Sequence, residues 1–160
     1  MNTRKLTHPV FTGIIAVAFC LLGQPAMADS GNQVPRPVKV LEGHLTITVD
    51  MQTGEYEFTD WAWASHTGLN SNSGAGVLDL TTGVFLSGTG LIVAANGDTI
   101  SWTVGGNLPN TVLYTGGTGR FEGVTGSISV FVASQTLLSD NGDGTMTFLM
   151  TYTGAGTIIY

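Results

Sequence analysis

The feature that most constrains the fold of this chain is the alternation of apolar and polar residues, which glycine, asparagine and aspartate interrupt at short intervals. Runs rich in Val, Ile, Thr, Phe and Trp recur from residue 38 onward, and none keeps the period of an amphipathic helix. Such spacing is typical of an all-β sandwich or barrel. The pattern predicts strands at about residues 38–49, 55–66, 76–80, 84–94, 99–105, 111–115, 125–138 and 145–158.

The first two predicted strands can be placed in register across the turn 51–54. If Asp50 pairs with Glu55, one face becomes mainly apolar, and a slip of one residue would mix the two faces. The apolar face pairs Val49 with Tyr56, Ile47 with Phe58, Leu45 with Asp60 and Leu41 with Ala64. The opposite face pairs Thr48 with Glu57, Thr46 with Thr59, His44 with Trp61 and Glu42 with Trp63. We take the apolar face as the interior.

A second hairpin is predicted to turn at Asn96-Gly97, a dipeptide suited to the positive φ angles of a two-residue type I′ turn. This turn pairs Val93 with Ile100 and Leu91 with Trp102, which places Trp102 on an apolar face. The last two strands also separate their apolar residues onto one face, which holds Ile128, Val130, Val132, Met146, Phe148, Met150 and Tyr152.

Strands with one apolar face can either stack as a sandwich or close into a barrel. Closure is favoured because mostly short turns link the strands in meander order and because a barrel leaves no free sheet edge. The chain also lacks the Cys and Trp framework of an immunoglobulin domain. Glycines inside strands suit barrel corners and bulges, as at Gly88, Gly90, Gly154 and Gly156. We therefore predict an all-β, eight-stranded antiparallel barrel of the meander type.

The N-terminus has the pattern of a cleavable secretory signal peptide over residues 1–28. Arg4 and Lys5 precede an apolar stretch at 10–22, and Ala26-Met27-Ala28 forms a small-x-small cleavage site. The apolar stretch is too short to span a bilayer, so we expect no stable membrane anchor. We expect export to the periplasm or the cell exterior, an extended leader at 29–37, and one barrel domain at 38–160.

Loss of the signal peptide would change both the charge and the redox chemistry of the chain. It removes the single cysteine, so disulfides cannot stabilise the exported domain. It also removes two of five cations, which leaves three against eleven carboxylates and takes the net charge from −6 to −8. Such an acidic surface repels phosphate backbones, so nucleic acid is not expected as a partner.

A glycine-rich run at 116–126, Gly-Gly-Thr-Gly-Arg-Phe-Glu-Gly-Val-Thr-Gly, is the most distinctive segment. It lacks the glycine spacing and the following helix of a dinucleotide fingerprint, and it lacks the Gly-Lys of a phosphate loop. We interpret it as a tight turn in which Arg120 meets a carboxylate and Phe121 plugs the barrel end.

This run, together with Ala95-Asn96-Gly97-Asp98, resembles the pattern of the allene oxide cyclase and dirigent-like barrels, which include many small exported bacterial proteins. The resemblance spans about residues 43–158. It implies an eight-stranded antiparallel barrel, often oligomeric, with an apolar cavity. Members of known activity position a reactive, largely apolar intermediate for cyclisation or coupling. The resemblance carries over no catalytic residue to a position of this chain.

Asp60 is the leading candidate for a site residue because the register points it into the interior beside Tyr56. A buried carboxylate must find partners or take up a proton. It could serve as a polar anchor or acid in a ligand cavity, or it could pair with Arg120 or a backbone amide near a barrel end. We include Tyr56, Trp102 and His66 as ligand-binding candidates, with His66 at the barrel mouth.

Trp61 and Trp63 form an aromatic strip with His44 and Glu42 on the predicted outer face. Exposed tryptophans in this number indicate a covered surface, either an oligomer interface or a ligand contact. If the two faces were inverted, the same residues would line the cavity.

Metal and cofactor sites are not expected. The segment Asp140–Gly144 has alternating oxygen ligands but lacks the closing glutamate of a calcium loop. Only His44 and His66 would remain for zinc, with no cysteine. No serine lies in a Gly-x-Ser-x-Gly elbow.

Three functions remain open from the sequence. The first is an exported barrel that binds a small apolar ligand in its interior, with Asp60 as polar anchor. The second is a cyclase or isomerase that steers a bound apolar intermediate without metal or nucleotide. The third is a structural or surface-interaction protein with a filled barrel.

Overall fold

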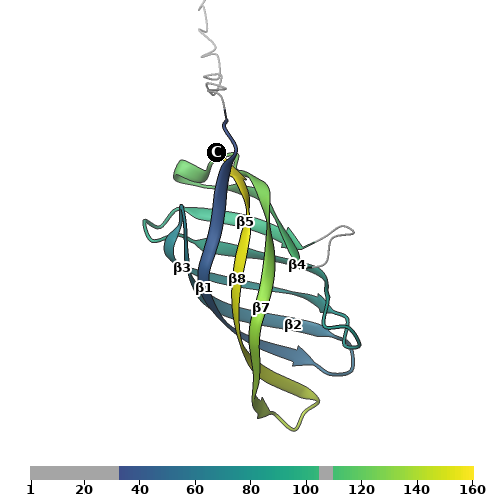
Figure 1. Cartoon of the computed structure of the whole chain (residues 1–160). Helices are drawn as coiled ribbons and strands as arrows, with labels where there is room; N and C mark the ends of the chain where they lie inside the picture. The colour runs from purple at the N-terminus through teal and green to yellow at the C-terminus, as the bar shows by residue number, and fades with distance from the viewer. Residues whose placement is uncertain (1–32, 105–109) are drawn as a thin grey trace, which may run out of the picture. The chain divides into compact units, whose positions relative to one another are not determined.

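The computed structural model describes residues 33–104 and 110–160. In this part of the chain, eight strands each pair antiparallel with the next, and the last pairs with the first to close a barrel (Figure 1). The predicted fold is therefore confirmed. The strands are β1 (Arg36–Asp50), β2 (Glu55–Ala64), β3 (Gly68–Leu78), β4 (Phe85–Val93), β5 (Thr99–Val104), β6 (Thr111–Gly117), β7 (Thr125–Asp140) and β8 (Thr145–Ile159), with one 3₁₀ turn, η1, at Gly119–Phe121.

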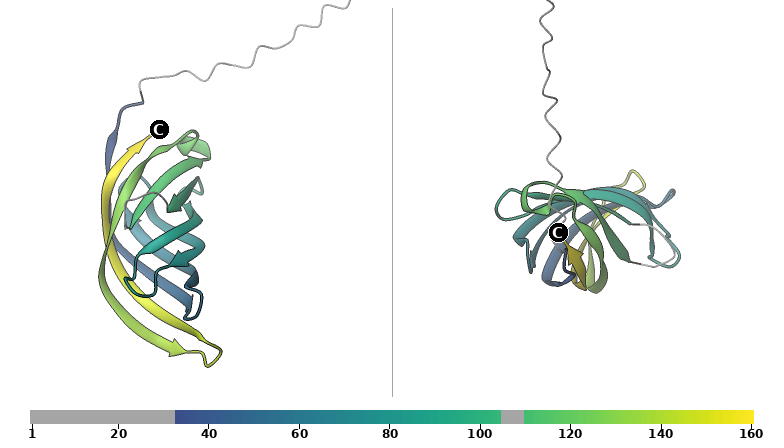
Figure 2. Two further views of the ribbon diagram at one scale, coloured as in Figure 1. Left: turned by 90° about the vertical axis from the view of Figure 1, so that its right-hand side faces the viewer. Right: turned by 90° about the horizontal axis from the view of Figure 1, so that it is seen from above.

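Strands β1, β7 and β8 are the longest and lie side by side, while β2 to β5 cross behind them (Figure 1, Figure 2). Strand β7 extends beyond β6, because the pairing between β6 and β7 ends at Ser129 whereas β7 and β8 stay paired as far as Asp140. Among the described residues, no helix is long and apolar enough to cross a bilayer. The predicted signal peptide, Cys20 included, lies outside the described residues.

The register of the first hairpin is confirmed from Val49–Tyr56 to Glu42–Trp63. One predicted pair is wrong, because the register shifts between Val40 and Glu42. Val40, not Leu41, therefore lies opposite Ala64, and Leu41 is 62% exposed. This irregularity lets the strand keep an apolar inner face on both sides of the bulge.

The register predicted for the second hairpin is wrong by one residue. The observed pairs are Val93 with Thr99, Ile92 with Ile100 and Gly90 with Trp102. The loop holds three residues, since the amide of Ala94 bonds the carbonyl of Asp98 and Gly97 has a φ of 88°. A three-residue loop with a left-handed glycine shifts the ladder by one residue, and such a shift moves side chains to the opposite face. Leu91 and Val93 are consequently exposed.

Strand β3 was predicted as a short segment at 76–80, and this is wrong. The strand spans Gly68–Leu78, and β2 ends at Ala64 instead of continuing to His66. Its first half, Gly-Leu-Asn-Ser-Asn-Ser-Gly, has little of the β-branched and aromatic content that marks strands. Pairing with β2 and β4 on both sides supplies its backbone partners, so tertiary context overrides weak local propensity.

Two hydrophobic clusters fill much of the interior. One surrounds Phe121, which is fully buried, and includes Ile100, Val124, Ile158 and Trp102. The other contains Ile47, Val49 and Tyr56 with Leu45 and Met150. The predicted role of Phe121 as a plug at the barrel end agrees with this burial. Arg120 meets a carboxylate through its backbone amide, which donates to Asp98 Oδ2 at 3.2 Å. Its guanidinium instead donates to the carbonyl of His66 and lies over the Phe121 ring.

Candidate functional site

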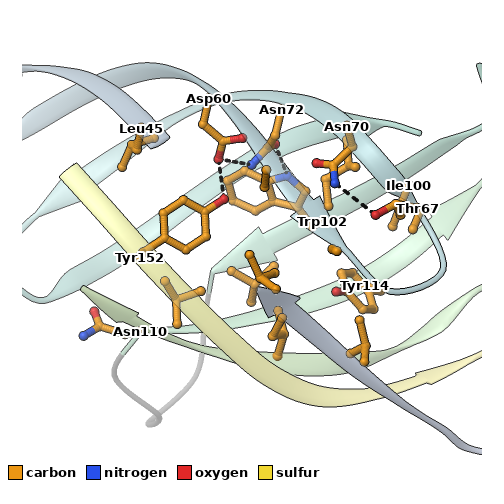
Figure 3. Close-up of a pocket in the computed structure, with 18 of the residues that line it drawn as sticks. Leu45, Asp60, Thr67, Asn70, Asn72, Ile100, Trp102, Asn110, Tyr114 and Tyr152 are labelled. Carbon is orange, nitrogen blue, oxygen red and sulfur yellow. Dashed lines mark hydrogen bonds between the residues drawn. The ribbon is translucent and has the colours of Figure 1, made fainter. Parts of the chain in front are cut away.

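A cavity of about 120 Å³ lies inside the barrel. Every strand contributes at least one side chain to its wall, which is mostly aliphatic and aromatic. The polar side chains of the wall gather on one side, where β2 and β3 run next to each other (Figure 3). They are Asp60, Thr67, Asn70 and Asn72, with Tyr114, Tyr152 and Asn110 elsewhere on the wall.

Asp60 is the centre of a hydrogen-bonded network in this wall (Figure 3). Its Oδ2 accepts from the Tyr152 hydroxyl at 2.8 Å and from the Asn72 side-chain amide at 3.1 Å. The Trp102 indole N–H in turn donates to Asn72 Oδ1 at 2.8 Å. The network thus links strands β2, β3, β5 and β8. The other carboxyl oxygen, Oδ1, is buried and has no hydrogen-bond partner in the described part of the chain.

Burial sets the charge state of Asp60. Desolvation raises the pKa of its carboxyl to about 6, and the hydrogen bonds from Tyr152 and Asn72 oppose this rise. Loss of water around a charge is costly, whereas donors to the carboxylate favour the ionised form. Burial also raises the pKa of Tyr114 to about 12, and burial together with the nearby Asp60 raises that of Tyr152. Asp60 is therefore ionised above neutral pH, and both tyrosines remain protonated there.

Glycines create the space in which the aromatic members of the network lie. A Cβ on Gly43 would fall 2.3 Å from the Tyr152 ring, and Cβ atoms on Gly74 and Gly90 would fall 2.8 and 2.3 Å from the Trp102 ring. These distances are far below van der Waals contact, so larger residues would displace the rings. The sequence predicted barrel corners or bulges at Gly88 and Gly90. Both lie in regular strand pairing instead, Gly88 beneath the Tyr56 hydroxyl and Gly90 beneath the Trp102 ring.

The structure brings together some of the predicted ligand-binding residues and separates others. Asp60 and Trp102 both line the cavity and belong to one network. Tyr56 is buried in the neighbouring cluster and donates to the carbonyl of Ser87, away from the cavity wall. His66 follows β2 in a turn with φ of 72°. Its ring bonds the Pro37 carbonyl at 2.9 Å and the Tyr160 hydroxyl at 3.1 Å, so it is not part of the wall either.

The aromatic strip lies on the outer face, as the register of the first hairpin predicted. Trp61 and Trp63 are 47% and 55% exposed. The His44 ring stacks on Trp61 with centroids 4.2 Å apart, and His44 Nε2 lies 2.8 Å from Glu42 Oε1. Leu69 of β3 pairs with Trp63 and extends this exposed apolar surface.

Sequence reasoning missed two central members of the site, Asn72 and Tyr152. Asn72 lies directly opposite Asp60 on β3, in the half of that strand that was not predicted. Tyr152 was assigned to the apolar face of its strand, but nothing in the sequence indicated that it reaches Asp60 across Gly43. A search for polar residues with inward parity in a glycine-rich strand would have found Asn70 and Asn72.

In the described ranges, no three His, Cys, Asp or Glu side chains are grouped so that they could hold a metal ion. In the segment predicted as a turn, Asp140 and Asp143 accept hydrogen bonds from Gly142 and Thr145 within the loop itself. No protein-family model matches this sequence, and no curated protein is significantly similar to it. The site must therefore be interpreted from its own geometry.

Proposed function

We propose that this protein binds a small apolar molecule inside its barrel. The observation that carries the proposal is a cavity with a mostly apolar wall and a single buried carboxyl, enclosed by a closed sheet. Ligand sites are typically concave and apolar, with a few polar groups that fix orientation. The barrel resemblance and the predicted export signal are consistent with a carrier or receptor outside the cytoplasm.

The cavity volume limits the size of the ligand. Its 120 Å³ is close to the roughly 150 Å³ of an apolar protein cavity that holds one benzene molecule. A single ring or a compact branched skeleton of about the size of benzene therefore fits without rearrangement. A long acyl chain does not.

Filling the cavity should abolish binding without unfolding the barrel. Ala62 is buried and lines the cavity, so Ala62→Leu places three more carbons inside it. Ala75→Leu is the matched control, because Ala75 is exposed on the outer face of β3. We expect toluene, titrated by calorimetry and by chemical-shift changes, to bind the wild type and Ala75→Leu but not Ala62→Leu.

The absence of any toluene binding to the wild type would rule out an accessible apolar cavity. Binding that persists unchanged in Ala62→Leu would place the ligand outside the barrel. Circular dichroism of each variant shows whether the barrel is intact.

A cyclase or isomerase is the second candidate, and Asp60 favours it. A carboxyl with a pKa near 6 in a mostly apolar cavity can donate or accept a proton near neutral pH. Incubating the protein with a small panel of compact unsaturated epoxides and alkenes, and comparing wild type with Asp60→Asn, tests this candidate. Conversion by the wild type that Asp60→Asn loses would support it, and equal product from both would exclude Asp60 as the catalytic group.

A further inference from the structure

The polar groups of the cavity wall differ in how much hydrogen-bonding capacity they have left. The Tyr152 hydroxyl and the Asn72 amide both donate to Asp60, and the Trp102 indole donates to Asn72. Asn70 donates to Thr67 Oγ1 and to the carbonyl of Gly68. These donors are directed at other protein groups. Two acceptors of the wall, by contrast, have no hydrogen-bond partner among the described residues: Asp60 Oδ1 and the side-chain oxygen of Asn110, of which only Asp60 belongs to a group that can carry a charge.

The charge of the wall is equally one-sided. The residues that line the cavity include one carboxyl, Asp60, and no Lys, Arg or His. An anionic ligand would meet a like charge with no counter-ion, which is strongly unfavourable where water is excluded. A donor, in contrast, would satisfy a buried oxygen whose unpaired state is costly.

We infer that the cavity selects compact apolar molecules that carry a hydrogen-bond donor, a hydroxyl or an amine, and rejects carboxylates. This inference rests on the proposed function and names the class of its ligand. Oδ2 of Asp60 stays bonded to Tyr152 and Asn72, which fixes the carboxyl plane, and the donor of the ligand pairs with Oδ1. The ring or branched skeleton occupies the apolar remainder of the cavity.

Five probes with one common ring separate the possible sources of affinity. Toluene has no polar group, benzyl alcohol and benzylamine carry donors, benzaldehyde carries a neutral acceptor, and benzoate carries an anion. At pH 8 we expect benzyl alcohol and benzylamine to bind roughly tenfold more tightly than benzaldehyde, which is the order of effect of one hydrogen bond to a charged group. We expect benzoate not to bind.

Two single-atom exchanges on the same strand test the role of Asp60. In Asp60→Asn, the amide oxygen can keep the bonds from Tyr152 and Asn72, and the amide nitrogen then points a donor where Oδ1 was. We expect the variant to lose the preference for benzyl alcohol and benzylamine and to favour benzaldehyde. Glu57→Gln is the matched control, since Glu57 is exposed on the outer face of β2, and it should leave the preference unchanged.

Tyr114 needs a control of its own because its hydroxyl lies across the cavity from the Asp60 network (Figure 3). It could donate to the carbonyl of benzaldehyde and mask the preference. The preference for benzyl alcohol should therefore persist, or increase, in Tyr114→Phe.

The pH dependence in the wild type gives a readout that needs no variant. The neighbours of Asp60 are Leu45 on β1, Asn72 on β3 and Tyr152 on β8, and the titratable groups of the wall are Asp60, Tyr114 and Tyr152. Burial raises the pKa of both tyrosines, so Asp60 alone titrates here between pH 5 and 8. The tenfold preference for benzylamine should therefore disappear at pH 5.

The outcomes separate the inference from the function on which it rests. The inference is wrong if toluene binds but either donor probe, benzyl alcohol or benzylamine, binds no more tightly than benzaldehyde. In that case the proposed binding of apolar molecules in the cavity is still supported. The inference is also overturned if the preference for donors survives in Asp60→Asn. If that variant fails to fold, a preference that survives in the wild type at pH 5 overturns the inference in the same way. If none of the five probes binds the folded wild type, the proposed function itself fails.

Discussion

At the end of the barrel where η1 lies, Phe121 is completely buried and packs against Tyr160 among aliphatic side chains. Further inside, Asp60 is almost as well buried, yet it carries an unpaired oxygen beside a cavity. The first region has the close packing of a stable protein core. The second retains empty space and an unfavourable charge, which proteins tend to keep where a function requires them. The packing that stabilises the fold and the features on which the proposed binding rests thus lie in different parts of one interior.

Truncation of the plug should have the largest effect. We expect Phe121→Ala to lower the free energy of unfolding by about 3 to 5 kcal/mol, because it leaves a cavity among rigid neighbours. Phe131→Ala removes the same side chain from a position that is 58% exposed and should cost well under 1 kcal/mol. Urea denaturation measures both. A loss below 1 kcal/mol for Phe121→Ala would show that this end of the barrel is not a packed core.

Whereas Phe121 stabilises the fold, the Asp60 carboxylate should destabilise it, by an amount that depends on pH. Burial raises its pKa from 3.8 to about 6, so the folded protein binds the proton more tightly than the unfolded chain. The stabilising contribution of the protonated carboxyl is complete below about pH 3.8 and is lost as the pH rises through about 6. The difference in pKa corresponds to about 3 kcal/mol.

The difference in unfolding free energy between Asp60→Asn and the wild type isolates this contribution. Between pH 4 and pH 8, Asp60→Asn should gain up to about 3 kcal/mol of unfolding free energy relative to the wild type, because the asparagine does not titrate. A flat curve for Asp60→Asn would mean that Asp60 is as well solvated as a surface carboxylate.

The outer side of the same wall should contribute least to stability. We expect the double variant Trp61→Ser, Trp63→Ser to change the unfolding free energy of the isolated subunit by less than about 1 kcal/mol, because both rings are already half exposed. If the strip is an oligomer interface, the wild type sediments as a larger species and the variant as a monomer. Equal sedimentation of both would remove the strip as an interface.

Much of the barrel could be predicted from the sequence because several hairpins carry strong local signals. In β1 and β2, apolar residues alternate so regularly that only one register separates the faces, and that register is observed from Val49 back to Glu42, where the register shifts. The second hairpin failed because Asn96-Gly97 fits either a two-residue or a three-residue loop, and the choice depends on where the strands pair. Local sequence does not contain that information.

The candidate site was only half predictable for a related reason. Asp60 could be assigned to the interior from parity alone. Its partners could not, because Asn72 lies in a strand of low β-propensity and Tyr152 meets Asp60 only through the closure of β8 onto β1. His66 was placed near the barrel mouth from the number of residues along β2. It lies in the turn after that strand, which ends two residues earlier, and its ring contacts Pro37 and Tyr160 instead of the cavity.

Closure of the barrel by pairing of β1 with β8 has a consequence for how the chain folds. The first strand has to wait for the last before the sheet is complete, and Tyr152 reaches Asp60 only at that moment. Contacts between distant parts of a sequence slow folding, because the loop between them has to be closed before they stabilise anything. A chain in which only the first seven strands have paired therefore has an open sheet, and the interior cavity is completed by the final strand.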